Sequence, residues 1–388
     1  MMYPNRKLFI PFALLVSGLF SSCTKQAPGN SGTGPGGTPN GSSASFNKIP
    51  IPTVNLAAQI IPNLNQFYVT NKGPYIQVLN TSQQKFSVYK YQGGSGSSAW
   101  TSFTPSFAAM YFRPTSMFYE TGSAFSVYWC NTNLTDDKYG MYNINTGTPA
   151  FEYLVPEGSN GPTVLSEIIP PTSSTNSGRP WGIVGNEIWR ESYVAVPRKF
   201  EKVIDLPGTD LRIRTDAIMA DPGSESTLWV ANAGRLYEIS EVGNPTPPYG
   251  TIKNSWNFNA VSITERITTI LKVNNDIVVQ FGNKIYKKNG TSFTKIGTLN
   301  ISATLTSNIC TSGSTIFASD GTYYDSNAGT WKSYIGDGLN LSGADAAKYA
   351  ELQGLCSSGL PIGCTYGSGS GPIYLLSPTE LIQVFPKF

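Results

Sequence analysis

The chain of 388 residues contains no histidine. This absence excludes Ser-His-Asp and Cys-His catalysis, imidazole acid–base chemistry and metal sites built on imidazole. The five cysteines form no CxxC pair and no cluster that would suggest a metal site. Any enzymatic reaction would have to rely on Asp, Glu, Tyr, Lys, Arg or a cofactor, and we expect neither a cofactor nor a metal.

Charged residues are also scarce, at 13% of the chain, against about 25% in typical globular proteins. There are 27 Lys and Arg residues, of which Arg6 and Lys7 belong to an N-terminal leader, against 24 Asp and Glu residues. The remainder is therefore close to neutral, and no basic run carries interleaved aromatics. Nucleic acid is not an expected partner.

Residues 1–22 have the pattern of an export signal, with two positive charges followed by an apolar stretch from Leu8 to Phe20. As a helix that stretch would cover only ~20 Å, whereas the hydrocarbon core of a membrane is ~30 Å thick. We expect a signal peptide, not a membrane span, and hence a protein that leaves the cytoplasm.

The leader ends in Phe20-Ser-Ser-Cys23, which resembles the lipobox of bacterial lipoproteins, with Phe20 and Ser22 departing from its usual form. The resemblance implies cleavage before Cys23 and attachment of lipid to its sulfur, which would anchor the protein to the outer membrane on either its periplasmic or its surface face. The alternative is ordinary secretion, with Cys23 lost or left as a thiol. Residues 23–45 are rich in Gly, Ser and Pro and predict a flexible linker.

The four other cysteines are an even number in a chain bound for an oxidising compartment, which suggests disulfides. Cys356 and Cys364 are the favoured pair because only seven residues separate them. Cys130 and Cys310 remain as a second pair, but both lie in strand-like apolar runs, where buried free thiols are common.

From residue 46 to residue 388 the chain shows short segments rich in Val, Ile and aromatics, bounded by Gly, Asn, Asp and Pro, which is typical of antiparallel strands. Four segments repeat a turn, an apolar residue and a closing aromatic at spacings of 38 to 49 residues: Gly185–Trp189, Ala233–Tyr237, Gly282–Tyr286 and Asp320–Tyr324. Weaker copies are Lys72–Ile76, Tyr139–Tyr142 and Pro378–Ile382. This period is that of a propeller blade.

The sequence therefore predicts an all-β fold, a single β-propeller over residues 46–388. The seven repeat positions favour seven blades, with six or eight left open and a pair of β-sandwiches as the competing fold. The last strands, IYLLS and LIQVF, are expected to share a blade with an N-terminal strand near Ile49 to Val54. One helix is expected at Ser342–Leu352, where Ser342 and Asp345 have capping-box spacing.

The repeats resemble kelch-like, two-component-regulator and sialidase-repeat propellers, families with members among bacterial surface lipoproteins. Leu228–Ile239, LWVANAGRLYEI, is similar to the strand–turn–strand core of the regulator repeat. Asp325–Trp331, DSNAGTW, resembles the sialidase Asp-box, with Asn327 in place of its Asp. The resemblance implies a fold and does not carry a function.

An enzyme is the alternative function. Tyr111–Pro114, YFRP, together with the Asp-box resembles the sialidases, which implies three arginines that grip a carboxylate and a histidine-independent glycosidase. The candidate arginines are Arg113, Arg190, Arg212, Arg214, Arg235 and Arg266.

We expect binding in preference to turnover. The expected ligand is a glycan or another envelope protein, held at the axial mouth of the propeller or on its top-face loops by a monomer. A structural or assembly role is the third option. A mouth lined by aromatics and amides would indicate binding, and paired carboxylates or three converging arginines would indicate glycoside chemistry.

Overall fold

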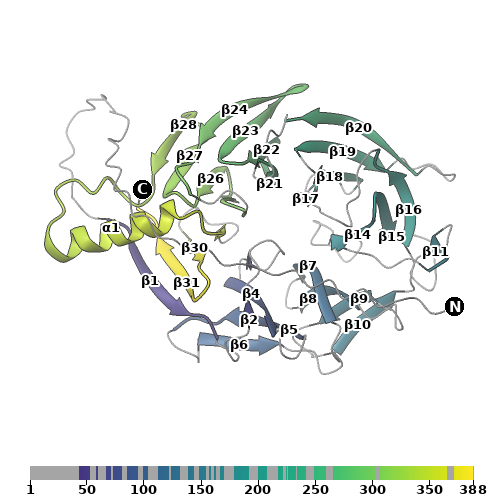
Figure 1. The fold of residues 1–388 in the computed structure, drawn as a ribbon, viewed down its shortest axis with the longest axis horizontal. Coiled ribbons are helices and arrows are strands. Elements are labelled where there is room, and N and C mark those ends of the chain that lie inside the picture. The colour runs from purple at the N-terminus through teal and green to yellow at the C-terminus, as the bar shows by residue number, and fades with distance from the viewer. Residues whose placement is uncertain are drawn as a thin grey trace, which may run out of the picture. The chain divides into compact units, whose positions relative to one another are not determined.

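The computed structural model describes residues 43–387 apart from a series of segments, of which the longest are 60–66, 104–111, 132–138, 170–178, 192–199, 208–216 and 242–248. Between residues 104 and 168 it describes the backbone alone. The leader, Cys23 and most of the expected linker therefore lie outside the described residues. The described part is built from antiparallel strands with one helix, α1 (Gly343–Ser357) (Figure 1).

The strands form six four-stranded sheets, one five-stranded sheet and one two-stranded ribbon in the described residues. The first three large sheets contain β2 (Ala58–Gln59), β3 (Phe67–Thr70), β4 (Gly73–Asn80), β5 (Lys85–Tyr91) and β6 (Trp100–Phe103); β7 (Phe112–Thr121), β8 (Ala124–Asn131), β9 (Tyr139–Asn143) and β10 (Thr148–Tyr153); and β13 (Glu167–Ile169), β14 (Trp181–Val184), β15 (Glu187–Glu191) and β16 (Phe200–Asp205).

The next three contain β17 (Ala217–Ala220), β18 (Thr227–Asn232), β19 (Arg235–Glu241) and β20 (Gly250–Asn257); β21 (Ile267–Val273), β22 (Asp276–Phe281), β23 (Lys284–Asn289) and β24 (Ser292–Thr298); and β25 (Ile309–Ser312), β26 (Thr315–Ala318), β27 (Thr322–Asp325) and β28 (Thr330–Ser333). The last, which we call the closing sheet, contains β29 (Ile362–Cys364), β30 (Ile373–Leu376), β31 (Glu380–Phe385) and β1 (Ser45–Pro50). The ribbon is β11 (Glu157–Gly158) and β12 (Gly161–Pro162).

Each large sheet contacts the next in chain order. The contacts run from β5 to β7, then to β13, β17, β21, β25 and β29, and β29 also contacts β3 of the first sheet. Because the last sheet contacts the first, the series closes on itself. The fold is therefore all-β and propeller-like, as the sequence predicted.

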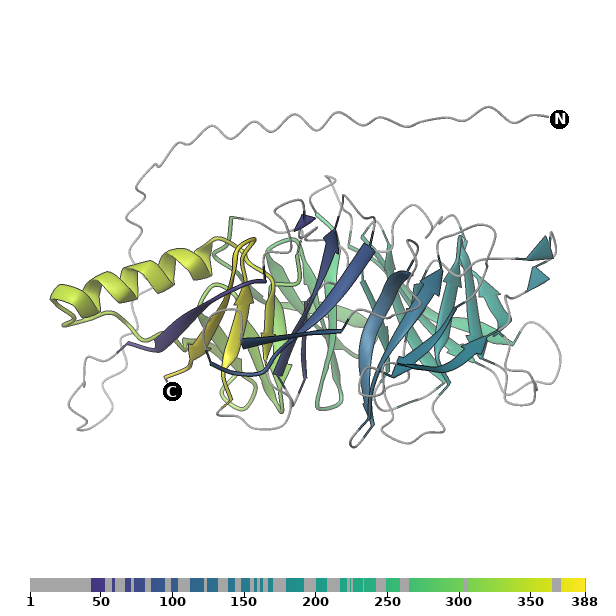
Figure 2. The same cartoon turned by 90° about the horizontal axis from the view of Figure 1, so that it is seen from below.

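The closing sheet joins the two ends of this series. β1 pairs antiparallel with β31 along its whole length, from Ser45 opposite Phe385 to Pro50 opposite Glu380. Figures 1 and 2 show β1, in purple, beside β31, in yellow. The shared N- and C-terminal sheet is confirmed, although its N-terminal strand lies at residues 45–50 and not at 49–54.

The repeated turn motif falls where one strand reverses into the next. Its glycines occupy the left-handed region, with φ of 60°, 77°, 59° and 89° at Gly185, Gly234, Gly282 and Gly321, between the second and third strands of four successive sheets. A glycine adopts this φ without the steric cost that a Cβ would bring. The weaker copies deviate: the described part of the first, Gly73–Ile76, lies at the start of β4, and Tyr139–Tyr142 lies inside β9.

Helix α1 begins where the sequence indicated and runs five residues further, to Ser357. Ser342 is its N-cap in extended conformation, but its side chain makes no cap hydrogen bond, so the capping box is not formed. The helix buries Leu352 and Cys356 against the closing sheet and Phe317. Packing of this face stabilises the helix in place of the cap.

We predict that Ile49→Ala lowers the free energy of unfolding by about 2–5 kcal/mol, because Ile49 is only 2% exposed and packs against Tyr91 and Trp100. Asn47→Ala, on the exposed side chain two residues earlier, should change it by less than about 0.5 kcal/mol. Urea denaturation of the full chain measures both. Equal effects of the two substitutions would show that β1 does not belong to the cooperative fold.

Candidate functional site

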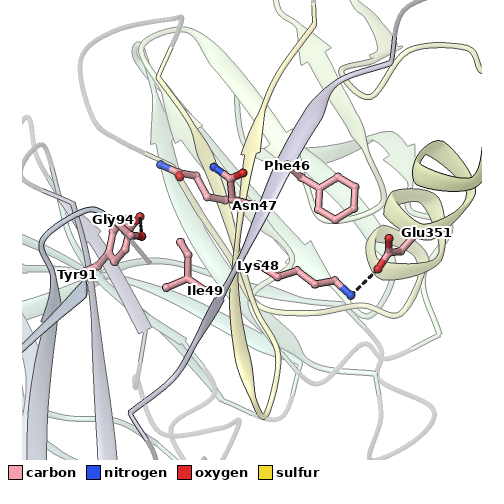
Figure 3. Close-up of a pocket in the computed structure, with 8 residues that line it drawn as sticks. Phe46, Asn47, Lys48, Ile49, Tyr91, Gly94 and Glu351 are labelled. Carbon is pink, nitrogen blue, oxygen red and sulfur yellow. Dashed lines mark hydrogen bonds and ion pairs between the residues drawn. The ribbon is translucent and has the colours of Figure 1, made fainter. Parts of the chain in front are cut away.

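A cavity of about 600 Å³ lies over β1, the edge strand of the closing sheet. β1, the end of β5 with the turn after it, β31 and α1 contribute the lining. The residues are Phe46, Asn47, Lys48, Ile49, Tyr91, Gly94, Glu351 and Gln383 (Figure 3). From the sequence we expected a ligand site at an axial mouth or on top-face loops, but this cavity lies at the edge of the closing sheet. It forms there because β1, as an edge strand, has one side open to the helix and to the neighbouring sheet.

The alternation of β1 decides which side chains face which neighbour, since successive residues of a strand point to opposite sides. Figure 3 shows Phe46 and Lys48 directed toward α1, and Ile49 directed toward Tyr91. Phe46 packs on the cluster that contains Leu352 and Cys356 of the helix. Ile49 is buried with Tyr91 in the cluster that joins the closing sheet to the first sheet.

Among the described residues that line the cavity, Lys48 carries the one cation, and it is paired. Its Nζ lies 2.5 Å from Oε1 of Glu351 on α1 and 4.0 Å from Oε2 of Glu380 on β31. The hydrogen bond to Glu351 and the two carboxylate charges raise the pKa of Lys48, against a smaller opposing effect of burial. The cavity therefore presents a neutralised ion pair.

Tyr91 lines the side of the cavity opposite α1, and its side chain is held by two contacts. Its hydroxyl donates to the carbonyl oxygen of Gly94 at 3.1 Å, and its ring lies tilted against Trp100 with centroids 5.6 Å apart. The indole of Trp100 donates in turn to the carbonyl oxygen of Pro50 at 2.9 Å. Burial raises the pKa of Tyr91, so its hydroxyl stays protonated as a donor at neutral pH.

The amides of the cavity come from neighbouring strands. Asn47 is exposed on β1 and lies opposite Gln383 of β31 in the register of the closing sheet. Gln383 donates from Nε2 to the hydroxyl of Tyr374 at 3.3 Å, which orients its amide. The lining thus combines two aromatic rings, two amides and one paired carboxylate.

The arginines proposed for a sialidase-like cage do not converge where the structure describes them. Arg190 is 2% exposed, stacks 4.2 Å from the Trp181 ring centroid, and lies 3.4 Å from the Glu241 carboxylate. Arg179 also contacts Glu241, at 2.5 Å. Arg235 lies at the opposite end of β19 from Glu241, which at ~3.3 Å per residue is ~20 Å away.

Of the other four candidates, one has different surroundings and three lie wholly or in their side chains outside the described residues. Arg266 is buried just before β21, with its carbonyl oxygen accepting from the amide of Gly282. Arg212 and Arg214 lie outside the described residues, as does the side chain of Arg113. The Arg179–Glu241–Arg190 group joins β19 to the preceding sheet, which is a structural role.

The Asp-box-like segment forms the turn between β27 and β28. Oδ1 of Asp325 accepts from the amides of Asn327 and Ala328 at 3.1 and 3.2 Å, and Lys332 lies 2.9 Å from Oδ2. The hydrogen bond from Lys332, followed by these amides, lowers the pKa of Asp325. The side chain thus holds a hairpin turn, in agreement with a fold-level resemblance.

Cys310, Cys356 and Cys364 are free, buried thiols of one core cluster. The thiol of Cys364 is hydrogen-bonded to that of Cys310, whereas Cys356 is hydrogen-bonded to the hydroxyl of Tyr334. The Cys356–Cys364 bridge favoured by sequence spacing stays a prediction. The side chain of Cys130 lies outside the described residues.

Sequence reasoning did not find the cavity residues. It placed the start of the folded body at residue 46 but assigned no role to Phe46, Asn47, Lys48, Glu351 or Gln383. No local signal could reveal them, because the cavity exists only after β1 pairs with β31 and α1 packs beside them. Among the residues described, no three His, Cys, Asp or Glu side chains are grouped so as to hold a metal ion. Nor does the described part contain a helix of the length and apolarity needed to span a membrane.

Comparisons with known proteins give a likeness of fold. No family model and no curated protein matches the sequence. The extracellular domain of a putative hybrid two-component system from B. thetaiotaomicron matches with a TM-score of 0.51 and 11% identity, over 89% of this chain and 40% of its own. An ancestral GH74 enzyme matches with a TM-score of 0.52 and 11% identity, over 89% of this chain and 51% of its own. The chain thus spans about half or less of these neighbours' lengths, and they share its all-β, propeller-like fold.

We predict that Glu351→Gln lowers the free energy of unfolding by no more than about 1 kcal/mol at low salt, because both partners are more than a third exposed. The loss should vanish at about 1 M NaCl, where the charges are screened. The pair's contribution is fully present below pH 10.5, the ordinary pKa of lysine, and is lost as the pH rises through the raised pKa of Lys48.

The matched control is Glu380→Gln, since this carboxylate lies 4.0 Å from the same ammonium group. Thermal denaturation of both variants at low and high salt should give the smaller effect for Glu380. A salt-independent loss in Glu351→Gln would assign the effect to helix packing instead of the ion pair.

Proposed function

We propose that this protein is an envelope-anchored binding module that holds an uncharged glycan segment in the cavity over β1. The observation that supports this most strongly is the lining: the rings of Phe46 and Tyr91, the amides of Asn47 and Gln383, and an ion pair that cancels its own charge. Ligand sites of this kind place a few polar groups on an apolar and aromatic surface.

The chemistry of the lining suits sugar hydroxyls. Each hydroxyl both donates and accepts, and an amide offers two donors and an acceptor in one plane. An aromatic ring gives an apolar face against which the C–H side of a sugar ring packs. Asn47 and Ile49 lie on the same side of β1, the side that faces Tyr91, so one sugar unit can meet the exposed amide of Asn47 and the ring of Tyr91.

The pairing of the carboxylates near the cavity with Lys48 favours binding over turnover. Glycoside hydrolysis commonly needs two carboxyl groups about 5 to 10 Å apart on either side of the scissile bond. Glu351 is the one carboxylate in the described lining. Glu380 lies near it, since the Nζ of Lys48 is 2.5 Å from Glu351 and 4.0 Å from Glu380, but both carboxylates are paired with that ammonium group. A histidine-independent carbohydrate-active enzyme is the second candidate function, and the GH74 enzyme among the structural neighbours favours it. An envelope protein is the alternative ligand.

The architecture proposed for this function is a seven-bladed propeller on a tether. Seven large sheets that contact one another in chain order, the last meeting the first, support seven blades. Cys23 would carry the lipid, and residues 23–45 would hold the folded body away from the outer membrane. We propose a monomer with no nucleic-acid partner.

A glycan array probed with the full chain tests the ligand. Asn47→Ala and Gln383→Ala should each weaken binding of any captured glycan by about tenfold, because each removes roughly one hydrogen bond worth ~1.4 kcal/mol. Asn289→Ala is the matched control, since it removes another exposed amide, on β23, away from the cavity.

Glycan binding that is equally strong in all three variants would remove the cavity as the site. Capture of no glycan, with retention of one envelope protein in a pull-down, would replace the glycan by a protein ligand. Release of reducing ends from a bound glycan would favour the enzyme.

The anchor is tested by Cys23→Ser. This change removes the sulfur that would carry the acyl chains, so the protein should move from the membrane fraction to the soluble envelope fraction. The control is Cys356→Ser, which leaves Cys23 in place. Membrane fractionation of Cys23→Ser at the wild-type level would contradict lipid anchoring.

A further inference from the structure

Two buried cysteines meet where the closing sheet contacts the sheet before it. Cys310 is the second residue of β25, Cys364 is the last residue of β29, and these two strands contact each other. Their thiols are hydrogen-bonded, and both side chains belong to one core cluster with Phe317 and Ile373. The residues are only 9% and 7% exposed. The fold itself has thus brought together two thiols that lie far apart in the sequence.

We propose that Cys310 and Cys364 form a disulfide bond that joins the closing sheet to the sheet of β25–β28. Two S–H bonds break and one S–S bond forms. The two electrons and two protons pass to a disulfide oxidant, protein or small molecule, which is reduced to two thiols. The cellular setting rests on the proposed export of the chain, since disulfides form in the envelope and not in the cytoplasm.

Cys356 is the competing partner, because a bond from Cys364 to Cys356 excludes the bond to Cys310. Cys356 lies in α1, and its thiol is hydrogen-bonded to the Tyr334 hydroxyl instead of to either cysteine. The geometry therefore favours Cys310.

The bond has to form while the chain is folding. Burial raises the pKa of Cys310 well above its ordinary value, and the thiolate is the species that exchanges with a disulfide. A protein folded in the reduced state should therefore oxidise slowly. Once formed, the bond should resist reduction, because the same burial excludes reductants.

The disulfide would link two neighbouring sheets, those of β25 and β29, close to the point where the series of sheets closes. The bond encloses residues 311–363, a segment that contains β26, β27, β28 and α1. A cross-link stabilises mainly by reducing the freedom of the unfolded chain, and it adds here to the pairing of β1 with β31.

The experiment refolds the full chain with a mixture of oxidised and reduced glutathione, blocks free thiols with N-ethylmaleimide in denaturant, and maps peptides by mass spectrometry. We expect a Cys310–Cys364 cross-linked peptide and an alkylated Cys356. A Cys356–Cys364 peptide in its place, or full alkylation of Cys310, would overturn the proposal.

A second measurement does not depend on the mapping. Reduction in denaturant followed by refolding without oxidant should lower the Tm of the wild type and of Cys356→Ala by roughly 5 °C. The same treatment should leave the Tm of Cys310→Ala and Cys364→Ala unchanged, because these variants have no bond to lose. A redox-dependent Tm in either of them would also overturn the proposal.

Discussion

The antiparallel pairing of β1 with β31 joins segments from opposite ends of the folded body, from Ser45 opposite Phe385 to Pro50 opposite Glu380. The closing sheet built on it packs on both faces. Leu375 and Ile382 face the cluster shared with Phe317 and α1, whereas Leu376 and Leu381 face the cluster shared with the first sheet. Loss of β1 would thus open both contacts and leave the edge of β31 unpaired. The entropy of bringing these distant strands together has to be recovered from that burial.

The cavity is a direct consequence of the same pairing. Because β1 is the edge strand, only one side of its backbone is paired, and its side chains meet α1 in one direction and Tyr91 in the other. The ion pair from Lys48 to Glu351 links the helix to the strand, and the Trp100 indole donates a hydrogen bond to the end of the strand at Pro50. The groups that shape the cavity therefore also contribute to the closure of the series, so the proposed ligand would bind to the closing sheet itself.

Buried polar contacts order the sheets around the rest of the series. Arg179 and Arg190 meet Glu241 from the neighbouring sheet, and Lys272 pairs with Asp221 across the next boundary. Further on, Gln280 and Asn308, both fully buried, exchange hydrogen bonds, and Asn308 continues to the carbonyl oxygen of Gly359 beyond α1. Each such group is costly to bury without its partner, so these contacts favour one arrangement of sheets over others. Arg179 and Arg190 thus have a structural role in this boundary.

Local sequence patterns were enough to predict the class of fold and the places where strands reverse, because glycines such as Gly185 and Gly282 adopt the positive φ that these turns need. A local helical segment with Ser342 and Asp345 also located the start of α1. The shared terminal sheet was predicted from strand-like segments at both ends of the folded body, although their pairing is a long-range contact. Tertiary structure alone decided that Cys364 faces Cys310 and that Asn47, Gln383 and Glu351 line one cavity. The alignment of residues from separate strands depends on which sheets adjoin and in what register, and no local propensity encodes that. The Cys356–Cys364 pairing was inferred from spacing along the chain. In the folded protein, however, the distance between two cysteines depends on which strands are neighbours, and β25 and β29 contact each other.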